Sequence, residues 1–82
     1  MENKYNYADL VEFKFTFDNK TRNLQGYVFI IDKYGTFEQN EEPSYDVYVD
    51  NFGLVKHIRE SKLKLVKKAD KETKRALELG AF

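Results

Sequence analysis

The apolar residues near the start of the chain alternate with polar residues, as is typical of β-strands. Residues 10–17 place four apolar side chains on one face, Val11, Phe13, Phe15 and Phe17. Their polar neighbours fall on the other face, so this segment is predicted to be a strand that buries one side. The polar residues 18–23 are rich in turn formers and predict a chain reversal.

Residues 24–32 carry β-branched and aromatic side chains at both odd and even positions. This pattern predicts a central strand covered on both faces, with Gly26 as a candidate for a bulge or a bend. Residues 34–44 are predicted to be a long loop, because Gly35 and Pro43 interrupt them and no period persists.

Three further strands are predicted after this loop. Residues 45–50 alternate, residues 51–53 supply a tight turn, and residues 54–58 pair back as a hairpin. One short turn at residues 59–61 then leads into a fifth strand at residues 62–66.

The last part of the chain changes to a helical period. The residues that share one helical stripe are Ala69, Thr73, Ala76, Leu77 and Gly80. Asp70 is placed to cap the first turn, and Gly80 is placed to end the helix. A short C-terminal helix over residues 69–80 is therefore predicted.

This order of strands and connections predicts a fold. A polar first connection, a long second one, a tight third turn and a single helical turn before the last strand are the wiring of an SH3-like barrel, and closure would remove exposed sheet edges. A barrel of the oligonucleotide-binding type is the competitor, but it usually places a helix where this chain has only residues 51–53. The predicted fold class is mostly β: a small five-stranded SH3-like barrel at residues 8–67 and a short C-terminal α-helix, in a single domain of residues 1–82.

Composition is consistent with one small core. A chain of 82 residues with 16% aromatic side chains can fill a thin core with large groups. The absence of cysteine excludes disulfides and thiolate metal sites, and it favours a reducing, cytoplasmic setting. No apolar run approaches the roughly 18 residues of a membrane span, and the first residues lack the apolar stretch of a signal peptide.

The net charge of zero hides a division along the chain. Residues 1–55 carry five basic and ten acidic side chains, a net charge of −5, whereas residues 56–75 carry nine basic and three acidic ones, a net charge of +6. This asymmetry predicts either an acidic and a basic face or charges that folding interleaves.

Two segments carry a resemblance to a group of known proteins. They are Tyr34-Gly-Thr-Phe-Glu-Gln-Asn-Glu-Glu-Pro-Ser-Tyr-Asp46 and Leu54-Val-Lys-His-Ile-Arg-Glu-Ser61. With them, the stretch from Gly26 to Val66 resembles small uncharacterised proteins from phages, prophages and conjugative elements of low-GC Gram-positive bacteria. The resemblance implies a mobile-element origin, and it implies no activity for particular residues.

No residue pattern predicts catalysis. His57 is the single histidine, and a histidine-based catalyst needs an orienting carboxylate and a nucleophile beside it. Glu60 and Ser61 are near in sequence, but the chain has no Gly-x-Ser-x-Gly motif. His57 is therefore interpreted as a half-exposed strand residue, and the chain is predicted to be no enzyme and to use no cofactor.

The long loop offers carboxylates and aromatic rings. Its acidic residues, Glu38, Glu41, Glu42 and the following Asp46, do not match the spacing of a calcium loop, so no metal site is predicted. By alternation, Phe13, Phe15, Phe17 and Val47 belong to the core. The aromatic residues left free for the surface are Tyr34, Phe37, Tyr45, Tyr48 and Phe52.

Two functional hypotheses follow. The first is a non-catalytic protein-binding module, a phage or mobile-element adaptor or inhibitor of a host protein, that recognises its partner through Tyr34, Phe37, Glu38, Glu41, Glu42, Tyr45 and Tyr48. The alternative is a nucleic-acid-binding accessory protein that uses the basic residues Lys56, Arg59, Lys62, Lys64, Lys67 and Lys71.

Overall fold

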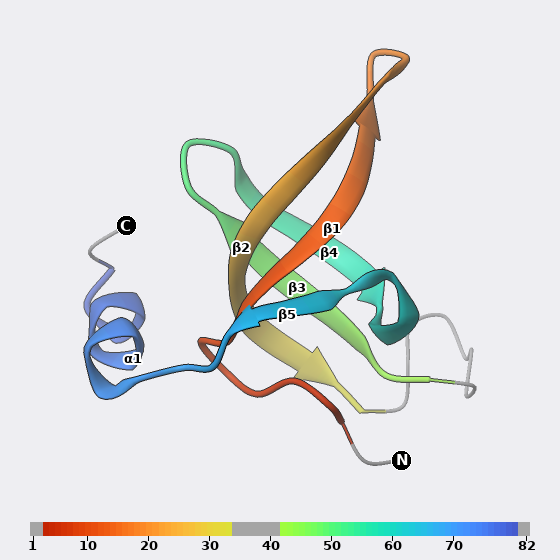
Figure 1. Cartoon of the computed structure of the whole chain (residues 1–82). Helices are drawn as coiled ribbons and strands as arrows, with labels where there is room; N and C mark the ends of the chain where they lie inside the picture. The colour runs from red at the N-terminus through yellow and green to blue at the C-terminus, as the bar shows by residue number, and fades with distance from the viewer. Residues whose placement is uncertain (1–2, 34–41, 81–82) are drawn as a thin grey trace.

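The computed structural model describes residues 3–33 and 42–80, which form a mostly β structure (Figure 1). Five antiparallel strands and one short helix follow in the order β1 (Leu10–Phe17), β2 (Lys20–Asp32), β3 (Ser44–Val49), β4 (Gly53–Arg59), β5 (Lys64–Lys67) and α1 (Lys71–Glu78). A single 3-10 turn, η1 (Glu60–Lys62), precedes β5.

The strands form one bent sheet with the order β4-β3-β2-β1-β5. In Figure 1 the sheet folds over, so that β1 and β5 cross in front of β3 and β4. Hydrogen bonds do not close it into a barrel, because β4 and β5 remain at its two edges. The prediction of five antiparallel strands and a C-terminal helix is therefore confirmed at the level of the sheet.

The connection between β1 and β2 is shorter than predicted. Asp18 and Asn19 alone form the turn, with φ values of 54° and 60°, so β2 begins at Lys20 and not at residue 24. Two successive left-handed residues are the mark of a type I′ turn, whose twist suits a tight hairpin and which aspartate and asparagine tolerate. The resulting hairpin projects beyond the rest of the sheet (Figure 1).

The second strand is central, as predicted, since it pairs with β1 and β3. It is not covered on both faces, however, because Phe29 and Ile30 are 41% and 47% exposed. The bulge lies at Phe29, where the register with β3 shifts between Val28 and Ile30. Gly26 has a different role: a Cβ there would overlap the carbonyl oxygen of Tyr48, so glycine permits close approach of β2 and β3.

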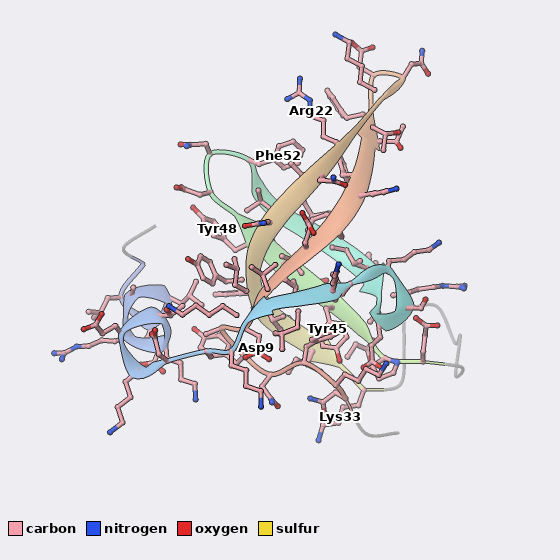
Figure 2. All side chains as sticks on the ribbon, in the orientation of Figure 1. Asp9, Arg22, Lys33, Tyr45, Tyr48 and Phe52 are labelled. Atoms are coloured by element: carbon pink, nitrogen blue, oxygen red, sulfur yellow. The ribbon has the colours of Figure 1, made fainter. Side chains whose placement is uncertain are left out.

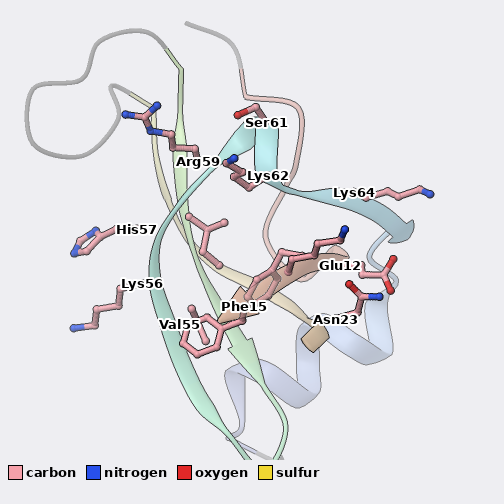
Figure 3. Close-up of a pocket in the computed structure, with 13 residues that line it drawn as sticks. Glu12, Phe15, Asn23, Val55, Lys56, His57, Arg59, Ser61, Lys62 and Lys64 are labelled. Atoms are coloured by element: carbon pink, nitrogen blue, oxygen red, sulfur yellow. The ribbon is translucent and has the colours of Figure 1, made fainter. Parts of the chain in front are cut away.

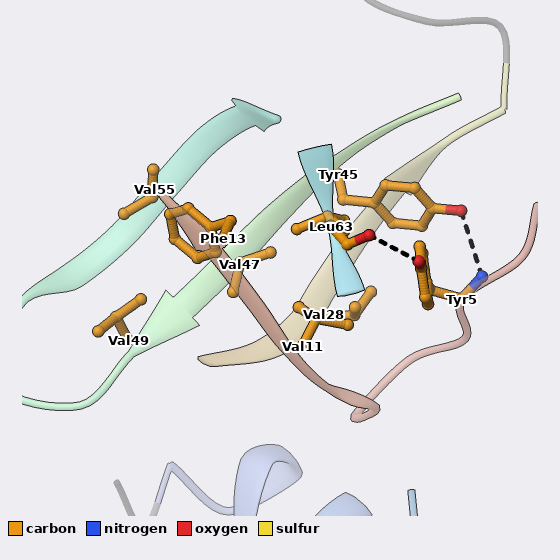
Figure 4. Close-up of a cluster of buried hydrophobic side chains, with 9 residues drawn as sticks. All are labelled: Tyr5, Val11, Phe13, Val28, Tyr45, Val47, Val49, Val55 and Leu63. Atoms are coloured by element: carbon orange, nitrogen blue, oxygen red, sulfur yellow. Dashed lines mark hydrogen bonds between the residues drawn. The ribbon is translucent and has the colours of Figure 1, made fainter. Parts of the chain in front are cut away.

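The core lies inside the bend of the sheet (Figure 4). Its buried side chains are Tyr5, Val11, Phe13, Val28, Tyr45, Val47, Val49, Val55 and Leu63. The predicted core positions Phe13 and Val47 are confirmed, and Phe15 packs partly buried against them. The prediction for Phe17 is wrong: its side chain is 69% exposed, because it lies at the end of the projecting hairpin, past the last layer of the core.

The later elements match the sequence pattern closely. The β3–β4 hairpin turns at residues 50–52, where Asn51 has a φ of 63°. The fifth strand starts two residues later than predicted, because Lys62 belongs to η1.

The helix is capped as predicted. Asp70 accepts a hydrogen bond from the backbone N–H of Thr73 at 2.7 Å, and Gly80 follows the helix with a φ of 67°. The buried Asp9 carboxylate holds the connection between β5 and α1 in place, because it accepts a hydrogen bond from the N–H of Ala69 at 2.8 Å (Figure 2). No helix in the described part of the chain is long and apolar enough to cross a membrane.

Candidate functional site

A groove of about 840 Å³ lies between β1 and β4 (Figure 3). Its apolar lining comes from Phe13, Phe15, Val55 and Ile58. In this region β1 extends past its last β5 partner, Glu12, and β4 is an edge strand. The groove therefore occupies the place where the bent sheet stays open.

The rim of this groove is strongly basic. It carries one carboxylate, Glu12, and five cationic side chains, Lys14, Lys56, Arg59, Lys62 and Lys64. We call this site the basic groove, and Lys14, Lys56, Lys62 and Lys64 the groove lysines. Figure 3 shows Lys56 and His57 on one side and Lys64 on the other, with Phe15 and Val55 between them. The site thus combines an apolar floor with cations along its edges, where Lys56 and His57 extend outward from β4.

A bulge in β4 presents Lys56 and His57 at the rim. Tyr45 pairs with Ile58 and Val47 with Val55, which leaves Lys56 and His57 both opposite Asp46. His57 has a φ of 63°, and its N–H donates to Asp46 Oδ1 at 2.9 Å. Because a bulge changes the direction of the side chains around it, two neighbouring residues are both exposed here. The histidine is a strand residue, as expected, and it is exposed.

The turn η1, which carries Lys62, is held by residues before β3. Glu42 accepts a hydrogen bond from the N–H of Ser61 at 2.7 Å, and this bond lowers the pKa of the Glu42 carboxyl below its usual value. The N–H of Glu60 donates to the carbonyl of Pro43 at 2.9 Å. Glu42, predicted to contact a partner, is therefore engaged in holding the end of the basic groove in shape.

Tyr45 is also part of the architecture. Its side chain is only 1% exposed, so the prediction that it is free for the surface is wrong. Its hydroxyl donates to Glu60 Oε2 at 2.6 Å and accepts from the N–H of Tyr5 at 3.3 Å. Burial, reinforced by the Glu60 carboxylate, raises the pKa of Tyr45 above its usual value. A tyrosine can occupy this core because Glu60 satisfies its hydroxyl.

Five residues of the predicted protein-binding set remain, and the described part of the structure does not bring them together in one site. Tyr34, Phe37, Glu38 and Glu41 lie outside the described residues. Tyr48 is half-buried on β3, on the opposite face from Tyr45, because the two positions differ by an odd number.

The predicted nucleic-acid-binding set is brought together in part. Lys56, Arg59, Lys62 and Lys64 all line the basic groove. Lys67 and Lys71 do not line it, and Lys67 lies 3.6 Å from the carboxylate of Asp70. Sequence reasoning missed Lys14 and Phe15 as site residues. The pairing of β1 with β5 brings their segments together, and no local sequence pattern indicates that pairing.

Comparison with known proteins identifies no relative. The chain matches no family model, and no curated protein or solved structure is significantly similar to it. No group of three metal-ligating side chains is found among residues 3–33 and 42–80. The mobile-element origin therefore stays a prediction, and the function is argued from the groove itself.

Proposed function

We propose that this chain is a non-catalytic module of SH3-like topology whose basic groove binds the phosphate backbone of a nucleic acid. The observation that carries the proposal is the convergence of Lys14 with four of the six predicted nucleic-acid-binding cations on one groove. The sheet order and the 3-10 turn before β5 support the SH3-like topology.

The charge of the basic groove is available to a ligand. None of the groove lysines forms an ion pair within the described part of the chain. Several cations along one groove give it a positive potential, so an anionic ligand is favoured there. A nucleic acid offers phosphates at regular intervals, and each contact releases counterions.

The apolar floor of the basic groove favours a ligand that has apolar surface as well as negative charge. A simple inorganic anion would use only the lysines, whereas a nucleotide also carries flat, weakly polar surfaces that can contact the uncovered part of Phe15. The competing occupant is an acidic peptide that adds a strand to the edge of β4. If such a peptide binds there, the protein is a protein-binding module instead.

The test is binding of a fluorescent single-stranded DNA of mixed sequence, followed by anisotropy at rising salt. We expect the logarithm of the affinity to fall linearly with the logarithm of the salt concentration, by about 0.7 per phosphate contacted. Lys56→Glu/Lys64→Glu should weaken binding strongly, because it reverses charge on two sides of the basic groove.

The matched control is Lys71→Glu/Lys74→Glu, which changes the net charge equally but alters residues of α1. It should weaken binding far less than the groove variant does. Equal losses would mean that net charge alone attracts the DNA. Absence of binding at low salt, or preferential capture of an acidic peptide, would reject nucleic acid as the ligand.

A further inference from the structure

A second hollow of about 310 Å³ adjoins the basic groove and shares Phe15 with it. It lies between the projecting β1–β2 hairpin and the β3–β4 turn, and it is lined by Phe15, Phe17, Asp18, Lys20, Arg22, Leu24 and Phe52. Figure 2 shows Arg22 on the hairpin and Phe52 near the turn. Its volume lies at the small end of the roughly 300 to 1,000 Å³ of ligand pockets, so it suits a compact group.

Two aromatic rings of this hollow are exposed to solvent. Phe17 is 69% exposed and Phe52 is 50% exposed. The ring of Phe52 meets Phe15 edge to face, with centroids 5.3 Å apart and planes at 78°. This contact orients Phe52 while leaving half of its surface uncovered, and neighbouring exposed apolar side chains of this kind indicate a binding surface.

Cationic residues of β2 lie opposite two aromatic residues of β1. In the β1–β2 register, Phe15 is opposite Arg22 and Phe17 is opposite Lys20. Residues opposite each other in an antiparallel pair lie on the same face of the sheet. Phe15 and Phe17 therefore each have a positive side chain opposite them, and Asp18 is the single carboxylate of the hollow.

We infer that Phe17 and Phe52 form a stacking platform for unpaired bases and that the ligand of the basic groove is single-stranded. This inference rests on the proposed function. In a duplex the faces of the bases are covered by their neighbours, whereas a single strand can place a base on an aromatic ring. Lys20 and Arg22 then contact the phosphates that leave the basic groove.

The inference is tested with three probes: a short single-stranded DNA, the same sequence as a duplex, and an inorganic polyphosphate chain, which has phosphates but no bases. The wild-type protein should bind the single strand most tightly. Phe17→Leu should weaken that binding on the order of tenfold, because stacking loses a ring. The same substitution should leave polyphosphate binding unchanged, since no phosphate contact is removed.

Two further variants keep the result interpretable. Phe52→Leu should act like Phe17→Leu, but Phe52 packs against Phe15, so the more exposed Phe17 is the primary test. Phe29→Leu is the control, because Phe29 is also exposed and lines neither the hollow nor the basic groove. It should change no affinity.

The outcomes separate this inference from the proposed function. If all three probes bind equally and Phe17→Leu changes none of them, the stacking platform is wrong while the basic groove still stands. If the single strand binds and Phe29→Leu weakens it as much as Phe17→Leu does, the bases stack elsewhere and the inference is overturned. If no probe binds, both proposals fail.

Discussion

Gly26→Ala is expected to destabilise the fold by about 3 kcal/mol, at the upper end of the usual cost of overpacking. The new Cβ would overlap the carbonyl oxygen of Tyr48 and lie 2.7 Å from Val47 Cγ1. The main obstacle is backbone, and β3 is held between two hydrogen-bonded neighbours, so it cannot easily move away. Denaturant unfolding should show a lower midpoint with an unchanged slope.

The control for this substitution is Gln25→Ala, the neighbouring position on β2, whose side chain is exposed. It tests the effect of alanine in this strand without the close approach, and it should cost less than about 1 kcal/mol. If Gly26→Ala proved as mild as Gln25→Ala, the close packing of β2 against β3 would be contradicted.

Tyr45→Phe is expected to cost about 1 to 3 kcal/mol, because it removes a buried hydroxyl that satisfies other polar groups. The Glu60 carboxylate would lose its hydrogen bond from Tyr45, and the N–H of Tyr5 would lose its acceptor. Tyr7→Phe is the control, since Tyr7 makes a ring contact with Phe29 that phenylalanine preserves.

The pH dependence of this effect has a defined sign. Folding raises the pKa of Tyr45 above its ordinary value of 10.0, so the folded state holds the hydroxyl proton more tightly than the unfolded state. The stabilisation is complete below about pH 10 and is lost as the pH rises further. The difference in unfolding free energy between wild type and Tyr45→Phe should therefore narrow above pH 10. A gap that widened there would contradict the buried hydrogen bond to Glu60.

The fold could be predicted from the sequence where a period identifies an element. Alternation located the strand at residues 10–17, and Asp70 and Gly80 marked the ends of the helix. Alternation reports which face a side chain occupies, but not how far along the strand the core extends. For that reason Phe13 was predicted correctly and Phe17 was not.

The prediction that Tyr45 is free for the surface was wrong for a different reason. A tyrosine can enter a core only where its hydroxyl finds a partner, and its partner, Glu60, is 15 positions away in the sequence. No local sequence pattern indicates such a pair. The short turn at Asp18 and Asn19 could not be predicted either. The polar residues 20–23 have the composition of a loop, although they belong to β2.

The candidate site could be predicted only in part, for the same physical reason. The basic segment of the sequence supplied Lys56, Arg59, Lys62 and Lys64, because a charge run is visible in one dimension. Lys14 and Phe15 join them only after the sheet bends and β1 pairs with β5. The continuation toward Phe17 and Phe52 depends on a hairpin whose projection the pattern does not reveal.

The central claim, that the basic groove is the ligand site, is tested most directly by mapping backbone amide chemical shifts while short single-stranded DNA is added to the labelled protein. We expect the largest shifts at residues 13–15 and 55–59 and at Lys62 and Lys64, which line the basic groove from segments distant in sequence. Smaller shifts should extend to Phe17 and Phe52. Shifts confined to α1 or to the face of β3 that carries Tyr48, with the basic groove unaffected, would contradict the account.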